Sequence, residues 1–132
     1  MTPGLEARWK GEFPAFFREM GGSPRETCMG RGCECGDGWF ALIRNLCLEL
    51  RDYLDGRPDL DFRFTQVKEK FGLPRIYSEG VDDRTKALIE GARGASTGVC
   101  ERRGGQDAAN PDHRSTLCPA CQNVDLRGLR QR

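Results

Sequence analysis

The amino-acid sequence predicts a small α+β fold, in which a helical body carries a β-hairpin and a zinc-ribbon-like segment follows near the C-terminus. Apolar residues recur at helical spacing in three segments and alternate with polar residues in a fourth. A Cys-x-x-Cys pair lies in a tail with few large apolar residues. We expect one compact unit, with an α+β body over residues 1–93 and the tail over 94–132 packed on it.

Length and charge are those of an ordinary globular domain. The chain has 132 residues, of which 37% are hydrophobic and 31% charged, and its net charge is +1. Residues 1–92 carry 14 Lys or Arg and 16 Asp or Glu, whereas residues 93–132 carry 7 and 4. This asymmetry is far weaker than the basic stripe of a dedicated DNA-binding protein.

The sequence predicts a cytoplasmic protein with no membrane partner. No apolar stretch approaches the roughly 20 residues of a membrane span, and the N-terminus lacks the apolar region of a signal peptide. Seven cysteines in a reducing compartment favour metal ligands or buried thiols over disulfides.

The first expected helix spans residues 5–20, where an apolar stripe has spacings of three and four. Pro14 removes a hydrogen bond inside it, so we expect a break, or a second helix with Pro14 in its first turn. A long Gly-rich loop is expected over residues 21–36. The stripe consists of Leu5, Trp9, Phe13, Phe16, Phe17 and Met20.

A second helix is expected over residues 38–55. Asp37 is a good N-cap for it, Gly56 and Pro58 end it, and Trp39 is expected to anchor it against the hairpin. Its apolar face consists of Trp39, Leu42, Ile43, Leu46, Leu50, Tyr53 and Leu54.

Residues 61–79 are expected to form the hairpin, because apolar and polar residues alternate there. Pro74 falls near the start of the return strand, where a missing amide is tolerable. Asp82 precedes a third expected helix at about residues 83–93. The residues expected to face inward from this helix are Ala87, Leu88 and Ala92.

Residues 94–125 are too poor in large apolar side chains to fold on hydrophobic burial alone. They offer little beyond Val99, Leu117 and Val124. The tail is therefore expected to be either disordered or held by a bound metal ion.

The expected metal ligands are Cys100, His113, Cys118 and Cys121. The last two form a Cys-x-x-Cys pair, whose thiolates can both reach one Zn²⁺ ion. Cys100 lies where the first cysteine of a second pair is expected, but Arg103 stands at the second position. His113 is the only histidine and would complete a Cys₃His shell.

Alternatives to this ligand set remain open. A fourth ligand from Cys28, Cys33 or Cys35 would tie the long loop to the tail, and a degenerate site without metal is the remaining case. A redox Cys-x-x-Cys pair needs a thioredoxin-like setting that the sequence does not offer. The three loop cysteines themselves form either a second metal site or a thiol switch. Otherwise the loop is simply rich in cysteine, and one or two of its thiols are buried in the protein interior. Cys47 is expected to be a buried, inert thiol.

Two segments and the cysteine pattern together resemble a known family. Residues 35–43 read CGDGWFALI, residues 66–77 read QVKEKFGLPRIY, and the tail cysteines follow. Over residues 34–122 the chain resembles small uncharacterised proteins that are common in bacteriophages, prophages and bacterial genomes. The resemblance implies a phage or mobile-element origin and a zinc-ribbon tail, and it implies no assigned activity. Arg103 and Pro74 depart from the family pattern.

Three classes of function follow from these observations. The first is a non-enzymatic, zinc-stabilised interaction module that binds and inhibits a host protein, such as a defence factor. The second is nucleic-acid binding through arginines of the tail. The candidate partner-binding residues are Lys68, Lys70, Arg75, Arg102, Arg103 and Arg114. At the hairpin tip these charges either form a solvated turn that blocks edge aggregation or contact phosphate or an acidic partner.

The third class is a cysteine-dependent enzyme. It would use Cys33 or Cys35 as nucleophile and His113 as base. The sequence contains neither a Ser/His/Asp pattern nor a phosphate-binding loop. We therefore expect no enzyme.

Overall fold

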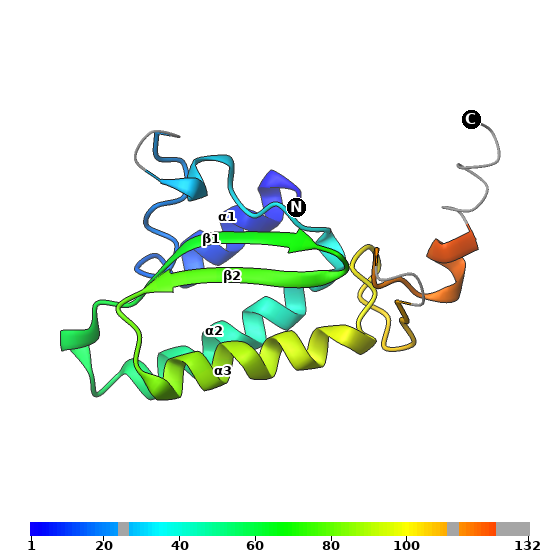
Figure 1. Cartoon of the computed structure of the whole chain (residues 1–132). Coiled ribbons are helices and arrows are strands. Elements are labelled where there is room, and N and C mark those ends of the chain that lie inside the picture. The colour runs from blue at the N-terminus through cyan, green and yellow to red at the C-terminus, as the bar shows by residue number, and fades with distance from the viewer. Residues whose placement is uncertain (24–26, 111–113, 124–132) are drawn as a thin grey trace.

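A computed structural model describes residues 1–23, 27–110 and 114–123. Its α-helices are α1 (Pro3–Glu12), α2 (Phe40–Leu54) and α3 (Asp83–Ala95), and its strands are β1 (Arg63–Lys70) and β2 (Leu73–Glu79) (Figure 1). The prediction of an α+β fold is confirmed. Of the helices in the described ranges, none has the length and hydrophobicity that crossing a bilayer requires.

The first helix is shorter than the apolar stripe suggested. Helix α1 ends at Glu12, and Phe13 leaves the helical region with φ −129° and ψ 61°. A residue before proline avoids helical dihedrals, so Pro14 explains where the helix stops. The expected break is confirmed, but residues 13–21 continue as turns and bends and form no second helix.

A 3₁₀ turn over Asp37–Trp39 leads into α2. The prediction that Asp37 caps this helix is wrong, because its Oδ1 accepts a hydrogen bond from the backbone N–H of Thr2 at 2.7 Å. Trp39 is fully buried, and its Nε1 donates to the carbonyl oxygen of Val99 at 3.1 Å. The start of α2 is thereby joined to the chain that follows α3.

The hairpin forms as predicted. Strands β1 and β2 pair antiparallel around a two-residue turn, in which Phe71 and Gly72 have φ of 56° and 81°. Two positive φ values match the right-handed twist of the strands. Glu34, from the Gly-rich loop, forms a parallel bridge with Lys68 on the other side of β1, so β1 lies between this loop and β2.

Helix α3 begins with a capping box. Asp82 accepts a hydrogen bond from the backbone N–H of Thr85, whose hydroxyl accepts one from the backbone N–H of Asp82. Leu88 and Ala92 are half-buried as expected. Ala87 is exposed, so its predicted inward orientation is wrong; it precedes Leu88 by one residue, a rotation of about 100° around the helix.

Most of the apolar core lies between the helices and the hairpin. Trp9 stacks on Phe17 and on Phe40, with ring centroids 5.5 and 5.2 Å apart. The largest fully buried apolar side chains include Trp9, Phe17, Met29, Trp39, Ile43, Leu50, Phe64 and Val67. A second, much smaller cluster lies in the tail, and it is built around cysteines.

Candidate metal centre

Three cysteine side chains meet in the tail. They are Cys100, Cys118 and Cys121, all buried, and their Sγ atoms all lie within 4.8 Å of one another. Sulfurs sharing one tetrahedral zinc ion lie roughly 3.8 Å apart, because each Zn–S bond is about 2.3 Å long. In residues 1–23, 27–110 and 114–123, no other set of three His, Cys, Asp or Glu ligand atoms comes this close.

A tight turn holds Cys100. The N–H of Gly104 donates to the carbonyl oxygen of Cys100 at 2.7 Å, and the N–H of Cys100 donates to that of Gly105 at 2.8 Å. Gly104 has a φ of 76°, which glycine adopts without strain. The turn therefore fixes the direction of the first ligand from the backbone alone.

Backbone amides surround the sulfur of Cys100. Burial by itself would raise the pKa of this thiol, but the N–H groups of Cys118, Arg103 and Arg102 donate hydrogen bonds to it and lower its pKa to about 7. The thiolate is the form that binds metal. Arg103, which replaces the expected fourth cysteine, thus still supports the site through its backbone.

Cys121 has the opposite tendency. Burial raises its pKa to about 11, and hydrogen bonds with Cys118 and Cys100 add to the shift. A second negative charge is therefore disfavoured among three adjacent sulfurs. A bound divalent cation would remove that penalty and stabilise all three thiolates.

A short antiparallel bridge brings the two halves of the centre together. Ala109 and Leu117 exchange backbone hydrogen bonds of 3.0 and 3.1 Å, and the N–H of Glu101 donates to the carbonyl oxygen of Thr116 at 3.0 Å. Apart from the cysteines, Leu117 and Ala108 are the apolar members of this cluster. The small apolar content agrees with the expectation that burial alone does not hold the tail.

The donor set fits a metal ion. Three buried sulfurs, one of them already favoured as thiolate, match a structural site with three cysteines and one further ligand. His113, the predicted fourth ligand, lies outside the described residues. Its role as a ligand stays a prediction.

The cysteines of the Gly-rich loop are placed apart from this centre. Cys28 is exposed, whereas Cys33 and Cys35 are buried in the main core. Burial raises the pKa of Cys33 well above its usual range and that of Cys35 to about 12. High pKa values are typical of packed, unreactive thiols rather than of nucleophiles. Cys47 is buried with a raised pKa as well, as predicted.

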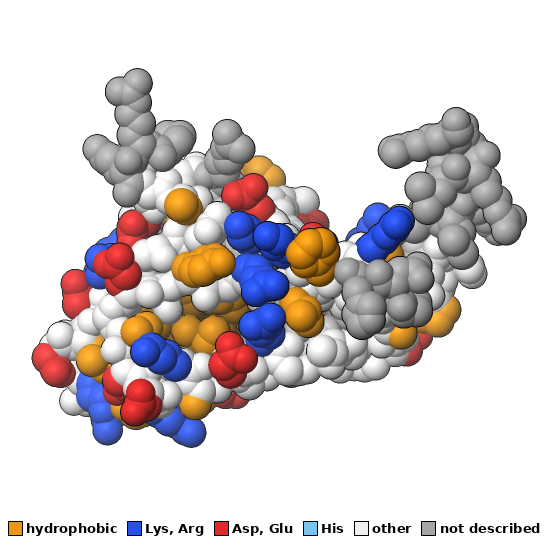
Figure 2. All heavy atoms as spheres, viewed as in Figure 1, with side chains coloured by type: hydrophobic (Ala, Val, Ile, Leu, Met, Phe, Trp, Pro, Cys, Tyr) orange, Lys and Arg blue, Asp and Glu red, His pale blue; other side chains and the backbone are white. Residues whose placement is uncertain are grey.

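The predicted partner-binding residues fall in two groups. Lys68 and Arg75 lie opposite each other in the hairpin register, and Lys70 is exposed near its tip. Figure 2 shows Lys and Arg side chains crossing this face, with hydrophobic side chains on either side. The tail arginines are exposed in the segments that carry Cys100 and Cys118; they are Arg102, Arg103 and Arg114.

The hairpin tip is bonded to the tail. Nδ2 of Asn110 donates to the carbonyl oxygen of Phe71 at 2.9 Å, and the hydroxyl of the buried Thr116 donates to that of Gly72 at 2.6 Å. Neither Asn110 nor Thr116 was expected to matter from the sequence. Each of them bonds to a backbone carbonyl oxygen, which every residue has. The contact therefore involves no characteristic pair of side chains that could be recognised in the sequence.

Glu101 is a second residue that the sequence did not single out. Burial raises the pKa of its carboxyl group to about 7, and the nearby charge of Glu69 adds to the effect. Its Oε2 is buried without a hydrogen-bond partner among the residues that the structure describes. Its position directly after Cys100 was the only signal in the sequence.

In comparisons with known proteins, no family model, curated protein or solved structure matches this chain.

Proposed function

We propose that this protein is a non-enzymatic interaction module, stabilised by one Zn²⁺ ion, that acts by binding another protein. The cluster of Cys100, Cys118 and Cys121 carries this proposal, because its backbone setting already favours a thiolate. Soft sulfur ligands favour zinc over the hard ions magnesium and calcium. In the proposed shell, His113 is the fourth ligand.

A shell of four protein ligands gives zinc a structural role. It leaves no open position for water or substrate, in contrast to catalytic zinc sites. The raised pKa values of Cys33 and Cys35 also speak against a cysteine nucleophile. Both points support a protein that works by binding.

The outer hairpin face supports a protein partner. Arginine and aromatic side chains are common anchors of protein interfaces, and this face combines them with lysines: Lys68, Lys70, Phe71, Arg75 and Tyr77. The resemblance to small phage proteins extends the proposal. The partner would then be a host protein, such as a defence factor, which the module inhibits by occupying its surface.

Nucleic-acid binding is the second candidate function. The combination of cations with the exposed rings of Phe71 (61% exposed) and Tyr77 (50%) favours it, since bases stack on such rings. The net charge of +1 gives it little electrostatic support. We therefore rank it below protein binding.

Affinity capture with a metal readout tests the proposal. The tagged, zinc-loaded chain is incubated with nuclease-treated bacterial lysates, and native mass spectrometry gives the stoichiometry of the eluted complex. We expect one host protein per chain and one zinc ion. Cys118→Ser should lose both, whereas Cys28→Ser, which changes an exposed cysteine outside the cluster, should keep both.

Two results would count against this function. Recovery of nucleic acid from untreated lysate, with no stoichiometric protein from any host, would favour the second candidate. A partner that stays bound to zinc-free Cys118→Ser would contradict the structural role of the ion.

A further inference from the structure

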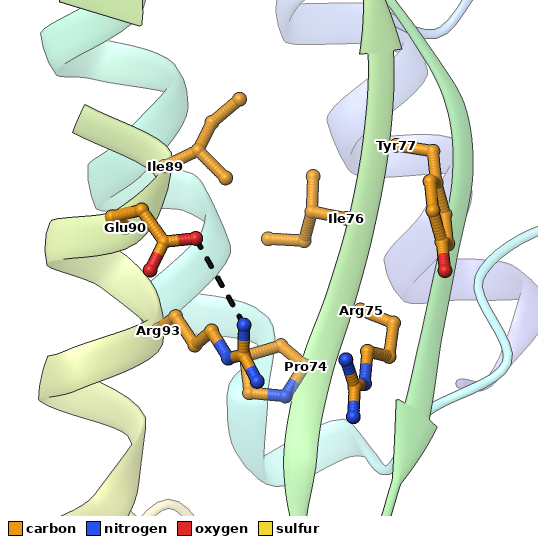
Figure 3. Close-up of a pocket in the computed structure, with 7 residues that line it drawn as sticks. All are labelled: Pro74, Arg75, Ile76, Tyr77, Ile89, Glu90 and Arg93. Atoms are coloured by element: carbon orange, nitrogen blue, oxygen red, sulfur yellow. Dashed lines mark ion pairs between the residues drawn. The ribbon is translucent and has the colours of Figure 1, made fainter. Parts of the chain in front are cut away.

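A groove runs between β2 and α3. Its lining consists of residues 74–77 of β2 together with Ile89, Glu90 and Arg93 of α3, and we call it the edge groove. Figure 3 shows the side chains of Ile76 and Ile89 directed toward each other across it, with Arg75 and Tyr77 on the other side of the strand. The edge groove therefore has an aliphatic wall on one side of β2 and a polar, aromatic surface on the other.

The backbone of β2 is unpaired along this groove. The sheet has two strands, so β2 pairs with β1 alone. Across the described ranges, no backbone hydrogen bond joins residues 73–79 to any segment other than β1. Alternate residues of such a strand direct N–H and C=O groups outward, which makes the edge a template for another strand. Pro74 removes one donor at the start of β2.

Positive charge borders the same edge. Arg75 has no carboxylate partner in the part of the chain that the structure describes, and its Nε is buried without a hydrogen-bond partner. Lys68 lies opposite Arg75 on β1. Arg93 makes an ion pair of 3.9 Å with Glu90, the one acidic residue of the lining. Both residues lie on the α3 side of β2, as Ile89 does, whereas Arg75 lies on the other side of the strand (Figure 3).

We propose that the edge groove binds an extended acidic segment of a partner protein, which adds to the hairpin as a strand beside β2. Successive side chains of a strand point to opposite faces. One set would pack on Ile76 and Ile89, and the other would lie beside Arg75 and Tyr77. The segment that fits thus alternates aliphatic residues with Asp or Glu. This inference rests on the protein-binding function proposed above and names the chemistry of its partner.

Two features favour a peptide over a nucleic acid at this place. An unpaired strand edge offers a row of alternating donors and acceptors that a peptide backbone matches and a sugar-phosphate backbone does not. The wall formed by Ile76 and Ile89 accepts aliphatic side chains, and the aromatic ring of the lining, that of Tyr77, lies on the other side of β2. The cations beside the edge suit a carboxylate held by that backbone pairing.

Selection from a random peptide library tests the proposal, because it lets the edge groove choose its own ligand. Random 12-residue peptides are displayed to the full, zinc-loaded chain, and enriched sequences are synthesised with a fluorescent label for binding by polarisation. We expect the enriched peptides to alternate Val or Ile with Asp or Glu. Arg75→Glu should weaken their binding by about tenfold or more, because the acidic side chains of the segment would lie beside Arg75.

Matched controls separate the edge groove from the rest of the surface. Lys86→Glu makes the same charge change on α3 at an exposed residue outside the lining, and it should leave binding nearly unchanged. Each selected peptide is also made with N-methyl groups on alternate residues, in both registers. Methylation in the register that faces β2 should abolish binding, whereas the other register should retain it.

Each outcome is decisive. Selected peptides that bind equally with either methylation register, or whose binding Arg75→Glu leaves unchanged, would overturn the edge groove while leaving a protein-binding function standing. A selection without acidic, alternating sequences would also overturn it. If, in addition, a 12-nucleotide oligothymidine binds and Arg75→Glu weakens that binding, the protein-binding function falls as well.

Discussion

Replacing Gly38 with alanine should weaken zinc binding without changing any ligand. The N–H of Gly38 donates to the carbonyl oxygen of Glu101 at 2.6 Å. A Cβ atom added at Gly38 would overlap the carbonyl oxygens of Cys100 and Glu101. Both are backbone atoms and cannot turn aside as a side chain would, so the turn that carries Cys100 has to move.

The expected magnitude follows from these two contacts. Losing the hydrogen bond costs about 1 kcal/mol, and forcing a methyl group against a packed backbone costs about 1–3 kcal/mol. If both costs fall on the docked, metal-bound tail, zinc affinity decreases about 30- to 700-fold, because each 1.4 kcal/mol corresponds to a factor of ten.

Competition with a chromogenic zinc chelator measures this affinity. Gly91→Ala is the control, because an added Cβ at Gly91 meets nothing within 4 Å and alanine favours a helix. It should keep wild-type zinc affinity and leave the free energy of unfolding equal or slightly raised. Wild-type zinc affinity in Gly38→Ala would refute the idea that the start of α2 positions the metal-binding turn.

Three further changes test separate parts of the structure. Arg103→Cys should raise zinc affinity in the chelator competition, because the backbone N–H of residue 103 already faces the sulfur of Cys100 and a thiolate at this position would replace His113, the proposed fourth ligand; unchanged or lower affinity would contradict this. Gly72→Ala should lower the free energy of unfolding in urea by about 1–2 kcal/mol or more, because Gly72 has a φ of 81° and an added Cβ would meet Asn110. Asp82→Asn should remove part of the acid sensitivity of unfolding. Hydrogen bonds from Tyr53 and the Thr85 amide lower the pKa of Asp82, so its stabilisation is complete above its unfolded pKa and is lost as pH falls through the lower folded value. Identical pH profiles would contradict that role.

The hairpin and the two longer helices were predictable because local patterns specify them. Alternation of apolar residues marks β1 and β2, and Phe71-Gly72 supplies the positive φ values of the turn. Asp82 was correctly placed at the start of α3. Asp37 was not a cap, because the N-terminus is close enough to use its carboxylate, and a contact 35 residues away leaves no local pattern.

The cysteine cluster of the tail was partly predictable for the same reason. Spacing alone identified Cys100, Cys118 and Cys121, since a pair of cysteines separated by two residues has few other uses in such a tail. The docking of the tail on the hairpin depends on hydrogen bonds to backbone carbonyls from Asn110 and Thr116. Carbonyls are present in every residue, so these contacts carry no signature in the sequence.

Hydrogen exchange of the tail with and without metal tests the central claim most directly. Amide exchange over residues 99–110 and 114–123 is followed by mass spectrometry in the zinc-loaded chain and after removal of the ion by a chelator. We expect protection of these amides to collapse without zinc, while strands β1 and β2 stay protected. Equal protection of the metal-free tail would show that its own packing orders it, and would contradict the proposed role of the ion.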